Sequence, residues 1–363
     1  MKYSFLGCLL LYCTLNWAQQ TPKPYAIEAA LLRGNVLLHS PYIPQFMTGH
    51  PEGFMLSYAH KTTGKQEWES AYNFPDYGLY FLYQDFKNST LGYNSAVGGF
   101  YKFYFANRHL SLKVAQGLAM TTHPYDRVTN SKNRAFGSRY MGNTDFVFAY
   151  TRDHILDKLG LDIGLYFTHY SNGRFKSPNS GINTYGLTVG LHYDVHSLPL
   201  TTPAITKPTV YTEPIKYNFI LRTGINESPS IGSGQKPFYH VGAYADKRLG
   251  RKSAIQLGTE VFFTLSNQEY IRYKALAFPE LHLDPNTDYK RVGVFVGHEL
   301  FINRLSLETQ LGYYVYQPYK MDISMYDRLG MKYYFSKNWF TGVGVKTHGF
   351  MAEATEFALG VRL

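Results

Sequence analysis

The sequence predicts an all-β protein, an antiparallel transmembrane β-barrel of the outer-membrane type with about 14 strands, within a range of roughly 12 to 16. Three observations support this fold class. Alternating apolar and polar runs of about 9–13 residues recur along the chain, which is the length of a tilted membrane strand. No stretch after the N-terminus approaches the roughly 18–20 apolar residues of a membrane-spanning helix. The composition, with 33 Tyr, 25 Phe and 32 Gly but only 17% charged residues, suits aromatic girdles and a glycine-tolerant barrel wall.

The N-terminus predicts a secretory signal peptide over residues 1–18. It has a basic start, a short apolar core and the small residue Ala18 at the expected cleavage point. Both cysteines, Cys8 and Cys13, fall inside this segment. We therefore expect no disulfide and no cysteine nucleophile in residues 19–363.

The regular strand pattern begins at Gly78, and two earlier segments, Ala26–Leu38 and Gly53–His60, alternate less clearly. Residues 19–363 are expected to form a single barrel domain, with 19–60 either as its first strands or as an N-terminal extension. Counting the two early segments raises the predicted number of strands to about 16. The regular runs are Gly78–Phe86, Tyr93–Phe105, His109–Met120, Thr144–Arg152, Leu161–Ser171, Asn183–Val195, Lys216–Gly224, Tyr239–Lys247, Ser253–Leu265, Tyr289–Phe301, Arg304–Tyr316, Tyr326–Phe335, Trp339–Thr347 and Glu353–Leu363.

The faces and the connections of these runs favour a membrane barrel over a soluble sandwich. Over Arg304–Tyr316 one face is nearly all apolar and the other is polar or small, and soluble sandwiches favour strands nearer five or six residues. Short basic turns such as Asn107-Arg108 alternate with long polar loops such as Thr121–Asn143, as periplasmic turns and outer loops do. The Pro- and Thr-rich connection Ser197–Pro214 does not fit, because the alternation predicts a short turn there.

The formal net charge of +10 has two readings. Lys and Arg in the short turns account for it without any partner. The functional reading is attraction to a polyanion. Nucleic acid does not suit a secreted, strand-rich chain, so anionic lipid head groups are the partner that we expect.

Reactive residue types lie on the apolar faces of two neighbouring predicted strands. Side chains two apart on a strand share a face, so His169 and Ser171 lie on one apolar face and Asn183 lies on that of the next strand. The connection 172–182 is an outer loop in this topology. The set therefore lies near the outer leaflet. A polar side chain that faces lipid there is energetically costly, which indicates a function for it.

These residue types suit nucleophilic catalysis. Serine attacks an ester only when a base takes its proton, and the base works best when a third group orients its ring. His169 can act as the base for Ser171, and Asn183 can orient the imidazole. Asn172 and the amides around Gly173 are candidate oxyanion donors. An H-x-S pattern on a strand also arises by chance.

Other candidates carry less weight. His192 and His196 share a face, but no carboxylate or third ligand accompanies them in the sequence, so we predict no metal site and no cofactor. Asp145 is either a substitute acid or, more simply, an interface residue. His39 and Ser40 lack an alternating frame and are interpreted as loop.

The run HYSNG at His169–Gly173, continued by KSPNSGIN at 176–183, closely resembles the motif of the lipid A 3-O-deacylases, the PagL-type outer-membrane barrels, and of their acyloxyacyl-hydrolase-like relatives. The resemblance covers mainly residues 110–195, and the strands after 215 exceed the small barrel of the best-known members. The chain also resembles the family in its upstream Asn-rich and Gly-Ser element, at Asn130, Asn133, Gly137 and Ser138.

The resemblance implies a barrel hydrolase of the bacterial outer membrane that removes an ester-linked acyl chain from lipid A of lipopolysaccharide. Ser171 would be the nucleophile, His169 the base and Asn172 part of the oxyanion hole. One departure is Asn183, where the family usually has Glu. A neutral Asn can orient the histidine but stabilises the imidazolium less.

Outer-membrane phospholipase A is also similar, because it has a His-x-Ser-Asn-Gly-Arg run and an Asn in its triad, as His169–Arg174 and Asn183 do here. The Pro178–Asn183 stretch favours the deacylases. A phospholipase acting on glycerophospholipids and a non-catalytic barrel therefore stay open as alternatives, and so does a homodimer.

Overall fold

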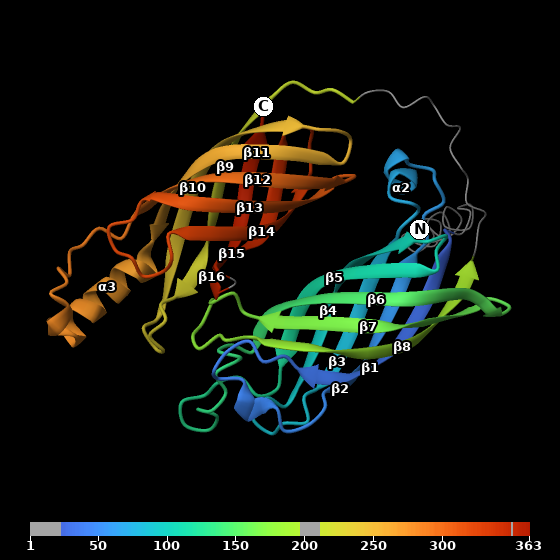
Figure 1. Cartoon of the computed structure of the whole chain (residues 1–363), viewed down its shortest axis with the longest axis horizontal. Coiled ribbons are helices and arrows are strands. Elements are labelled where there is room, and N and C mark those ends of the chain that lie inside the picture. The colour runs from blue at the N-terminus through green and yellow to red at the C-terminus, as the bar shows by residue number, and fades with distance from the viewer. Residues whose placement is uncertain (1–22, 197–210, 350) are drawn as a thin grey trace, which may run out of the picture.

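The computed structural model describes residues 23–196, 211–349 and 351–363, which form two closed antiparallel β-barrels of eight strands each (Figure 1). The predicted signal peptide lies outside the described residues. The first barrel comprises β1 (Tyr25–Val36), β2 (Glu52–His60), β3 (Asp76–Asp85), β4 (Tyr93–Phe105), β5 (Leu110–Thr121), β6 (Tyr140–Leu156), β7 (Leu159–Ser171) and β8 (Ile182–His196). The second comprises β9 (Lys216–Glu227), β10 (Gln235–Arg248), β11 (Ser253–Thr264), β12 (Arg291–Ile302), β13 (Leu305–Tyr316), β14 (Met325–Tyr334), β15 (Trp339–His348) and β16 (Met351–Arg362).

The predicted all-β, antiparallel class is confirmed, and the 16 strands lie within the predicted range of roughly 12 to 16, but they close into two barrels and not into the single barrel that the sequence predicts. The two early segments are full strands, and closure happens twice: β8 pairs with β1, and β16 pairs with β9. Eight strands are enough to close a barrel whose interior is filled by side chains, and closure removes every exposed edge. The connection Ser197–Pro214, which does not fit a single barrel, joins the two barrels.

Four short helices lie in the connections between strands in the described ranges. They are η1 (Pro44–Phe46), α2 (Glu67–Ala71), α3 (Leu265–Ala277) and η2 (Pro279–Leu281). The outer connection after β11, predicted as a loop, therefore contains the longest helix of the described chain. No helix in the described ranges is long and apolar enough to cross a membrane.

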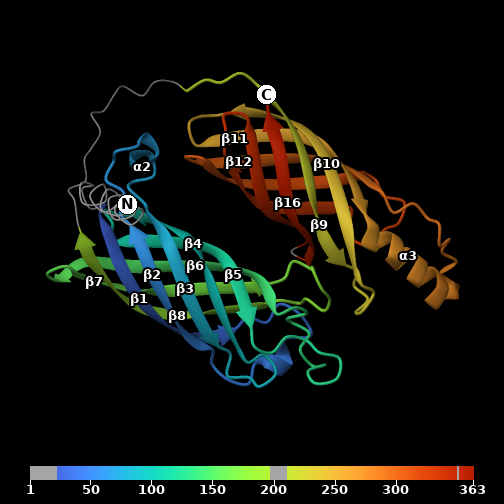
Figure 2. The same ribbon diagram turned by 180° about the vertical axis from the view of Figure 1, so that it is seen from behind.

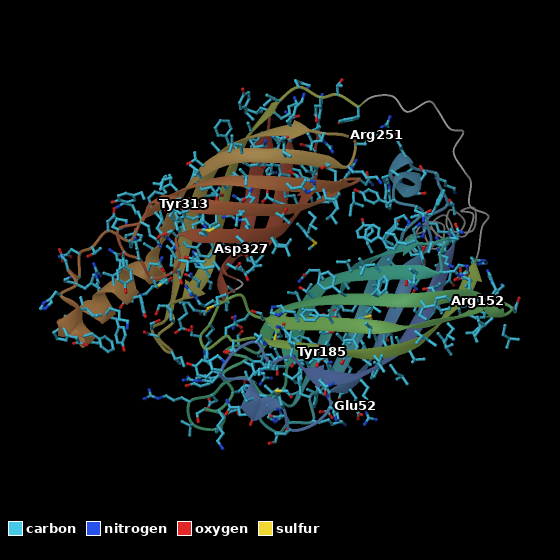
Figure 3. The ribbon with its side chains drawn as sticks, in the orientation of Figure 1. Glu52, Arg152, Tyr185, Arg251, Tyr313 and Asp327 are labelled. Carbon is cyan, nitrogen blue, oxygen red and sulfur yellow. The ribbon has the colours of Figure 1, made fainter. Side chains whose placement is uncertain are left out.

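The strands separate an apolar outer surface from a polar interior. On β8, for example, Leu187 and Leu191 are exposed on the outside, whereas Thr188 and His192 are buried inside. Aromatic side chains such as Tyr185 and Tyr313 project from the two outer surfaces (Figure 3). This alternation matches the period of two that the sequence shows, and it turns the apolar side chains toward lipid.

Paired charges fill the barrel interiors. In the first barrel, Glu28 accepts hydrogen bonds from Lys102 and Lys113. In the second, Arg328 bonds to the carboxylates of Glu260 and Glu356. A buried charge is costly unless an opposite charge and hydrogen bonds satisfy it, so these pairs hold opposite walls of each barrel together.

Replacing Glu356 by leucine should destabilise the second barrel by about 3–5 kcal/mol, because it leaves buried cations without their partner. Glu356 accepts bonds from Arg328 Nε at 2.6 Å and from His240 Nδ1 at 2.7 Å. The check is a urea titration in detergent in a Trp68→Phe background, so that the fluorescence of Trp339 on β15 reports on the second barrel. Glu52→Gln, which alters an exposed rim ion pair, is the control and should change stability by less than about 1 kcal/mol. Equal shifts for the two variants would contradict this account.

The two barrels lie side by side in the same orientation (Figures 1 and 2). Contacts join them at both ends. At the end with the short turns, the Tyr72 hydroxyl donates to the Phe301 carbonyl at 2.7 Å and Lys252 donates to the Ala71 carbonyl. At the end with the long loops, the Glu227 N–H donates to the Arg174 carbonyl at 3.1 Å. The loop after β7 therefore touches the second barrel.

Candidate active site

The β7–β8 register places His169 directly opposite Asn183. The His169 Nδ1 atom and the Asn183 Oδ1 atom are 2.5 Å apart. Both side chains lie on the outer faces of their strands, in line with the exposed Leu165 and Leu187, as the sequence predicts. The strand pairing thus delivers the orienting contact without help from a loop.

The hydroxyl of Ser171, at the last position of β7, is a hydrogen-bond acceptor twice. The backbone N–H of Gly173 donates to Oγ at 3.0 Å, and the Asn179 Nδ2 atom donates to it at 2.9 Å. Within the described ranges, no hydrogen bond joins Ser171 to His169. Because both bonds are accepted by Oγ, the hydroxyl hydrogen is left for a base.

Asn172 and Asn179 tie the start of the loop 172–181 to its end. The backbone N–H of Asn172 donates to Asn179 Oδ1 at 3.0 Å. The Asn172 Nδ2 atom donates to Ser138 Oγ at 2.9 Å and to the Lys176 carbonyl at 2.8 Å. Asn179 is a site residue to which sequence reasoning assigned no role, although it lies inside the quoted motif. The Asn172 side chain, predicted as an oxyanion donor, makes both of its donor contacts with the loops in this structure.

The connection between β5 and β6 supports this loop from one side. The Ser180 and Gly181 N–H groups donate to the Arg134 and Ala135 carbonyls at 3.0 and 3.2 Å. Gly181 has φ +66°, and a Cβ atom there would lie 2.8 Å from the Tyr170 carbonyl oxygen. Only glycine meets both demands without strain. The upstream element of the sequence motif is thus a partner of the site loop.

An apolar plug lies beneath the site. Tyr170 points into the first barrel and is fully buried, with its ring 5.9 Å from that of Phe86. Phe86 also meets Phe136 at 5.8 Å between ring centres. The Asn133 side chain accepts the N–H groups of Ala135 and Phe136, which fixes the plug in the barrel. The backbone under Ser171 therefore rests on a packed core.

Two other candidates lie elsewhere. Asp145 faces the barrel interior, where it accepts a bond from Thr168 at 2.7 Å, so its side chain lies on the opposite side of the barrel wall from the lipid-facing set. His192 also points inward and lies between Asp162 and Asp153, at 2.8 and 2.9 Å. The expectation that no carboxylate accompanies His192 is wrong, because Asp153 and Asp162 come from β6 and β7. In the described part of the chain, no group of three or more His, Cys, Asp or Glu could hold a metal ion.

His39, which the sequence analysis interprets as a loop residue without a role, is a neighbour of the site. It lies in the loop after β1, as predicted, with its Nε2 atom 3.1 Å from the Ser180 carbonyl oxygen. It is also close enough to act electrostatically on His169. The closing of β8 onto β1 brings this loop to the site, and no local sequence signal reports that closure.

Residues 52–192, which include the whole lipid-facing set, match the family described as lipid A 3-O-deacylase (PagL). Residues 215–363 match the family described as acyloxyacyl hydrolase, C-terminal domain. The chain belongs to the lipid A 3-O-deacylase family. As a lipid A 3-O-deacylase family member it is an ester hydrolase of the outer membrane. The first match runs from β2 to His192 on β8 and leaves out β1, and the second match covers all eight strands of the second barrel.

No curated protein matches the sequence of this family member. Among solved structures, a BenF-like porin from Pseudomonas fluorescens Pf-5 is 10% identical, with 94% of this chain and 97% of that chain covered and a TM-score of 0.24. A mutant porin of Rh. blastica is 9% identical, with 94% and 98% covered and a TM-score of 0.20. At these scores the likeness carries no argument about the arrangement of the strands.

Proposed function

We propose that this protein removes an ester-linked acyl chain from lipid A in the outer leaflet, with Ser171 as the nucleophile, His169 as the general base and Asn183 as the group that orients the base. The observation that carries the proposal is the position of this set on the lipid-facing surface, at the outer end of β7 and β8. A polar set at that place is costly unless it serves a substrate that lies in the leaflet.

The contact with Asn183 selects the tautomer of His169. The amide oxygen of Asn183 can only accept a hydrogen bond, so the Nδ1 atom of the neutral ring carries the proton. The Nε2 atom is then unprotonated and able to accept the hydroxyl hydrogen of Ser171. That hydroxyl must turn toward the ring, since its oxygen is bonded to Gly173 and Asn179 in the resting structure.

The reaction follows from these positions. Ser171 Oγ attacks the ester carbonyl carbon while its proton passes to His169 Nε2. The tetrahedral intermediate collapses, the bond to the sugar oxygen breaks, and that oxygen takes the proton from His169. Water, deprotonated by His169, then attacks the acyl-enzyme and releases the fatty acid. Ser171 regains its proton, so the enzyme ends as it began.

The oxyanion hole is the part of the mechanism that the loop supplies. The Gly173 N–H and the Asn179 amide already point at Ser171 Oγ, so they are placed for the negative charge that forms on the neighbouring carbonyl oxygen. The side chain of Asn172 would have to exchange a bond to Ser138 or Lys176 to donate there. We therefore propose that Asn172 shapes the hole by holding the loop, in addition to its predicted role as a donor.

The substrate is tested by offering the purified protein lipid A and a glycerophospholipid in separate mixed micelles. We expect fatty acid to be released from lipid A and not from the glycerophospholipid. Release from the glycerophospholipid alone would replace the proposal by a phospholipase A. Release from neither, with Ser171 unreactive toward a fluorophosphonate, would leave a non-catalytic barrel.

A further inference from the structure

We infer that the second barrel positions the loop 172–181 over Ser171, and that Glu227 is the positioning residue through which it acts. This inference rests on the proposed function, because the loop carries the groups that we assign to the oxyanion hole. The second barrel has its own closed sheet and its own buried charges, and its outer end contacts the loop that leaves Ser171.

Glu227, the last residue of β9, forms hydrogen bonds with the loop at two residues. Its backbone N–H donates to the Arg174 carbonyl at 3.1 Å. One carboxylate oxygen accepts the backbone N–H of Ser177 at 2.8 Å, and the other accepts that of Gly234 at 3.1 Å. Glu227 is only 2% exposed. A buried carboxylate needs such donors, so the loop and the turn after β9 are held in one position.

Two further contacts join the loop to residues that come after Glu227 in the chain. The Ser177 hydroxyl donates to the Ser228 carbonyl at 2.8 Å, and the Gln235 Nε2 atom donates to the Phe175 carbonyl at 2.9 Å. Three backbone groups and one hydroxyl of the loop are thus bonded to Glu227, Ser228 and Gln235, at the outer end of β9 and the start of β10. Contacts of this density order the loop in addition to its bonds with the first barrel.

Gly173 packs against the second barrel at the residue that donates to Ser171. It has φ +60°, and a Cβ atom placed on it would lie 1.9 Å from Thr355 Oγ1 on β16. Only glycine fits between Ser171 and Thr355. The N–H that faces the nucleophile is therefore placed by the wall of the other barrel.

Arg174 follows and extends toward the mouth of the second barrel. Its Nε and Nη2 atoms are buried without a hydrogen bond, and the guanidinium lies within electrostatic range of Asp322 and Glu353. Burial, and next the neighbouring Glu353, raise the pKa of Asp322, while the Arg174 guanidinium acts in the opposite direction. Opposite charges therefore draw the loop toward the second barrel.

These contacts preorganise the donors to Ser171, because they hold the loop in place before the substrate binds. Asn179 and Gly173 touch the nucleophile through bonds of 2.9 and 3.0 Å, and a displacement of about 1 Å in such groups lowers a rate severely. A loop held only by the first barrel would keep its contacts with Arg134 and Ala135 but lose those at Arg174 and Ser177. The second barrel supplies the support for residues 173–177, between the two places at which the first barrel holds the loop.

The test compares Glu227→Ala and Glu227→Gln in the full-length protein. Alanine removes both acceptors, so we expect kcat on a short-chain chromogenic ester, and the rate of Ser171 modification by a fluorophosphonate, to fall about 10- to 100-fold with KM nearly unchanged. Glutamine keeps one acceptor for Ser177 and should recover most of the rate. Tyr72→Phe, which removes a contact between the barrels at their other end, is the control and should stay within about twofold of the wild type.

A suppressor pair tests the same contact without touching Glu227. Gly173→Ala should lose at least about tenfold in both rates, because a φ of +60° is strained for alanine and because the added methyl group meets Thr355. Thr355→Ala should restore only the part of that loss that is due to Thr355. The inference is overturned if Glu227→Ala matches Tyr72→Phe in both rates. If the fluorophosphonate does not label Ser171 in the wild-type protein, the proposed function is overturned. If Ser171 is labelled but the substitutions leave kcat and the labelling rate unchanged, only the role of the second barrel is overturned.

Discussion

Ser171→Ala should lower ester hydrolysis by about 10⁴-fold or more, because it removes the hydroxyl that we assign as the nucleophile. The substitution removes one oxygen that accepts bonds from Gly173 and Asn179, and it leaves the pairing of β7 with β6 and β8 untouched. We therefore expect the barrels to fold normally. The measurement is kcat/KM on a chromogenic ester, together with the electrophoretic migration of unheated protein as a check of folding.

The matched control for this variant is Ser95→Ala. Ser95 is also an outward-facing serine near the outer end of a first-barrel strand, β4. It should keep wild-type activity, since nothing in its position couples it to His169. Loss of activity in both variants would point to a general effect of losing a hydroxyl, and retained activity in Ser171→Ala would exclude Ser171 as the nucleophile.

Asn183→Ala should lower kcat by about 100-fold or more, since it frees the His169 ring and its tautomer. The amide oxygen lies 2.5 Å from Nδ1 and comes from a rigid strand pair, so no neighbouring residue can replace it. Asn183→Asp has the same shape and adds a charge that stabilises the imidazolium formed in the transition state. Its kcat should equal or exceed that of the wild type. A fall in Asn183→Asp as large as in Asn183→Ala would show that Asn183 does not serve the histidine as proposed.

The measurement for these variants is the kcat of each at several pH values, with KM as a second readout. Thr184→Val changes the next residue on β8, whose side chain points into the barrel and bonds to Gln84. It provides a control for disturbing this strand without disturbing its lipid-facing side. We expect that variant to lose stability rather than kcat. A loss of kcat there equal to that of Asn183→Ala would place the effect in the strand and not in the orienting contact.

The lipid-facing set was predictable because a strand has a fixed period. Alternation alone puts His169, Ser171 and Asn183 on apolar faces, and the structure places them there. The same period made the strands after Gly78 predictable. Alternation says nothing about which strand closes onto which, so one barrel and two barrels have the same pattern. The only local signal was the long connection Ser197–Pro214.

What the sequence could not show depends on contacts between distant segments. The pairing of β8 with β1 brings His39 to the site, and the seating of the loop on β9 brings Glu227 to it. Asn179 sits eight residues after Ser171, but its role follows from the way the loop folds back. Such contacts are set by tertiary packing, which local patterns do not encode. The homodimer that the sequence leaves open stays a prediction.

The most direct test of the central claim is mass spectrometry of lipid A from cells that produce the wild-type protein or Ser171→Ala. Lipid A from the wild-type cells should lose the mass of one ester-linked acyl chain, and lipid A from the Ser171→Ala cells should keep it. An unchanged acylation pattern in the wild-type cells, with the folded protein present in their outer membrane and Ser171 reactive toward a fluorophosphonate, would contradict the account.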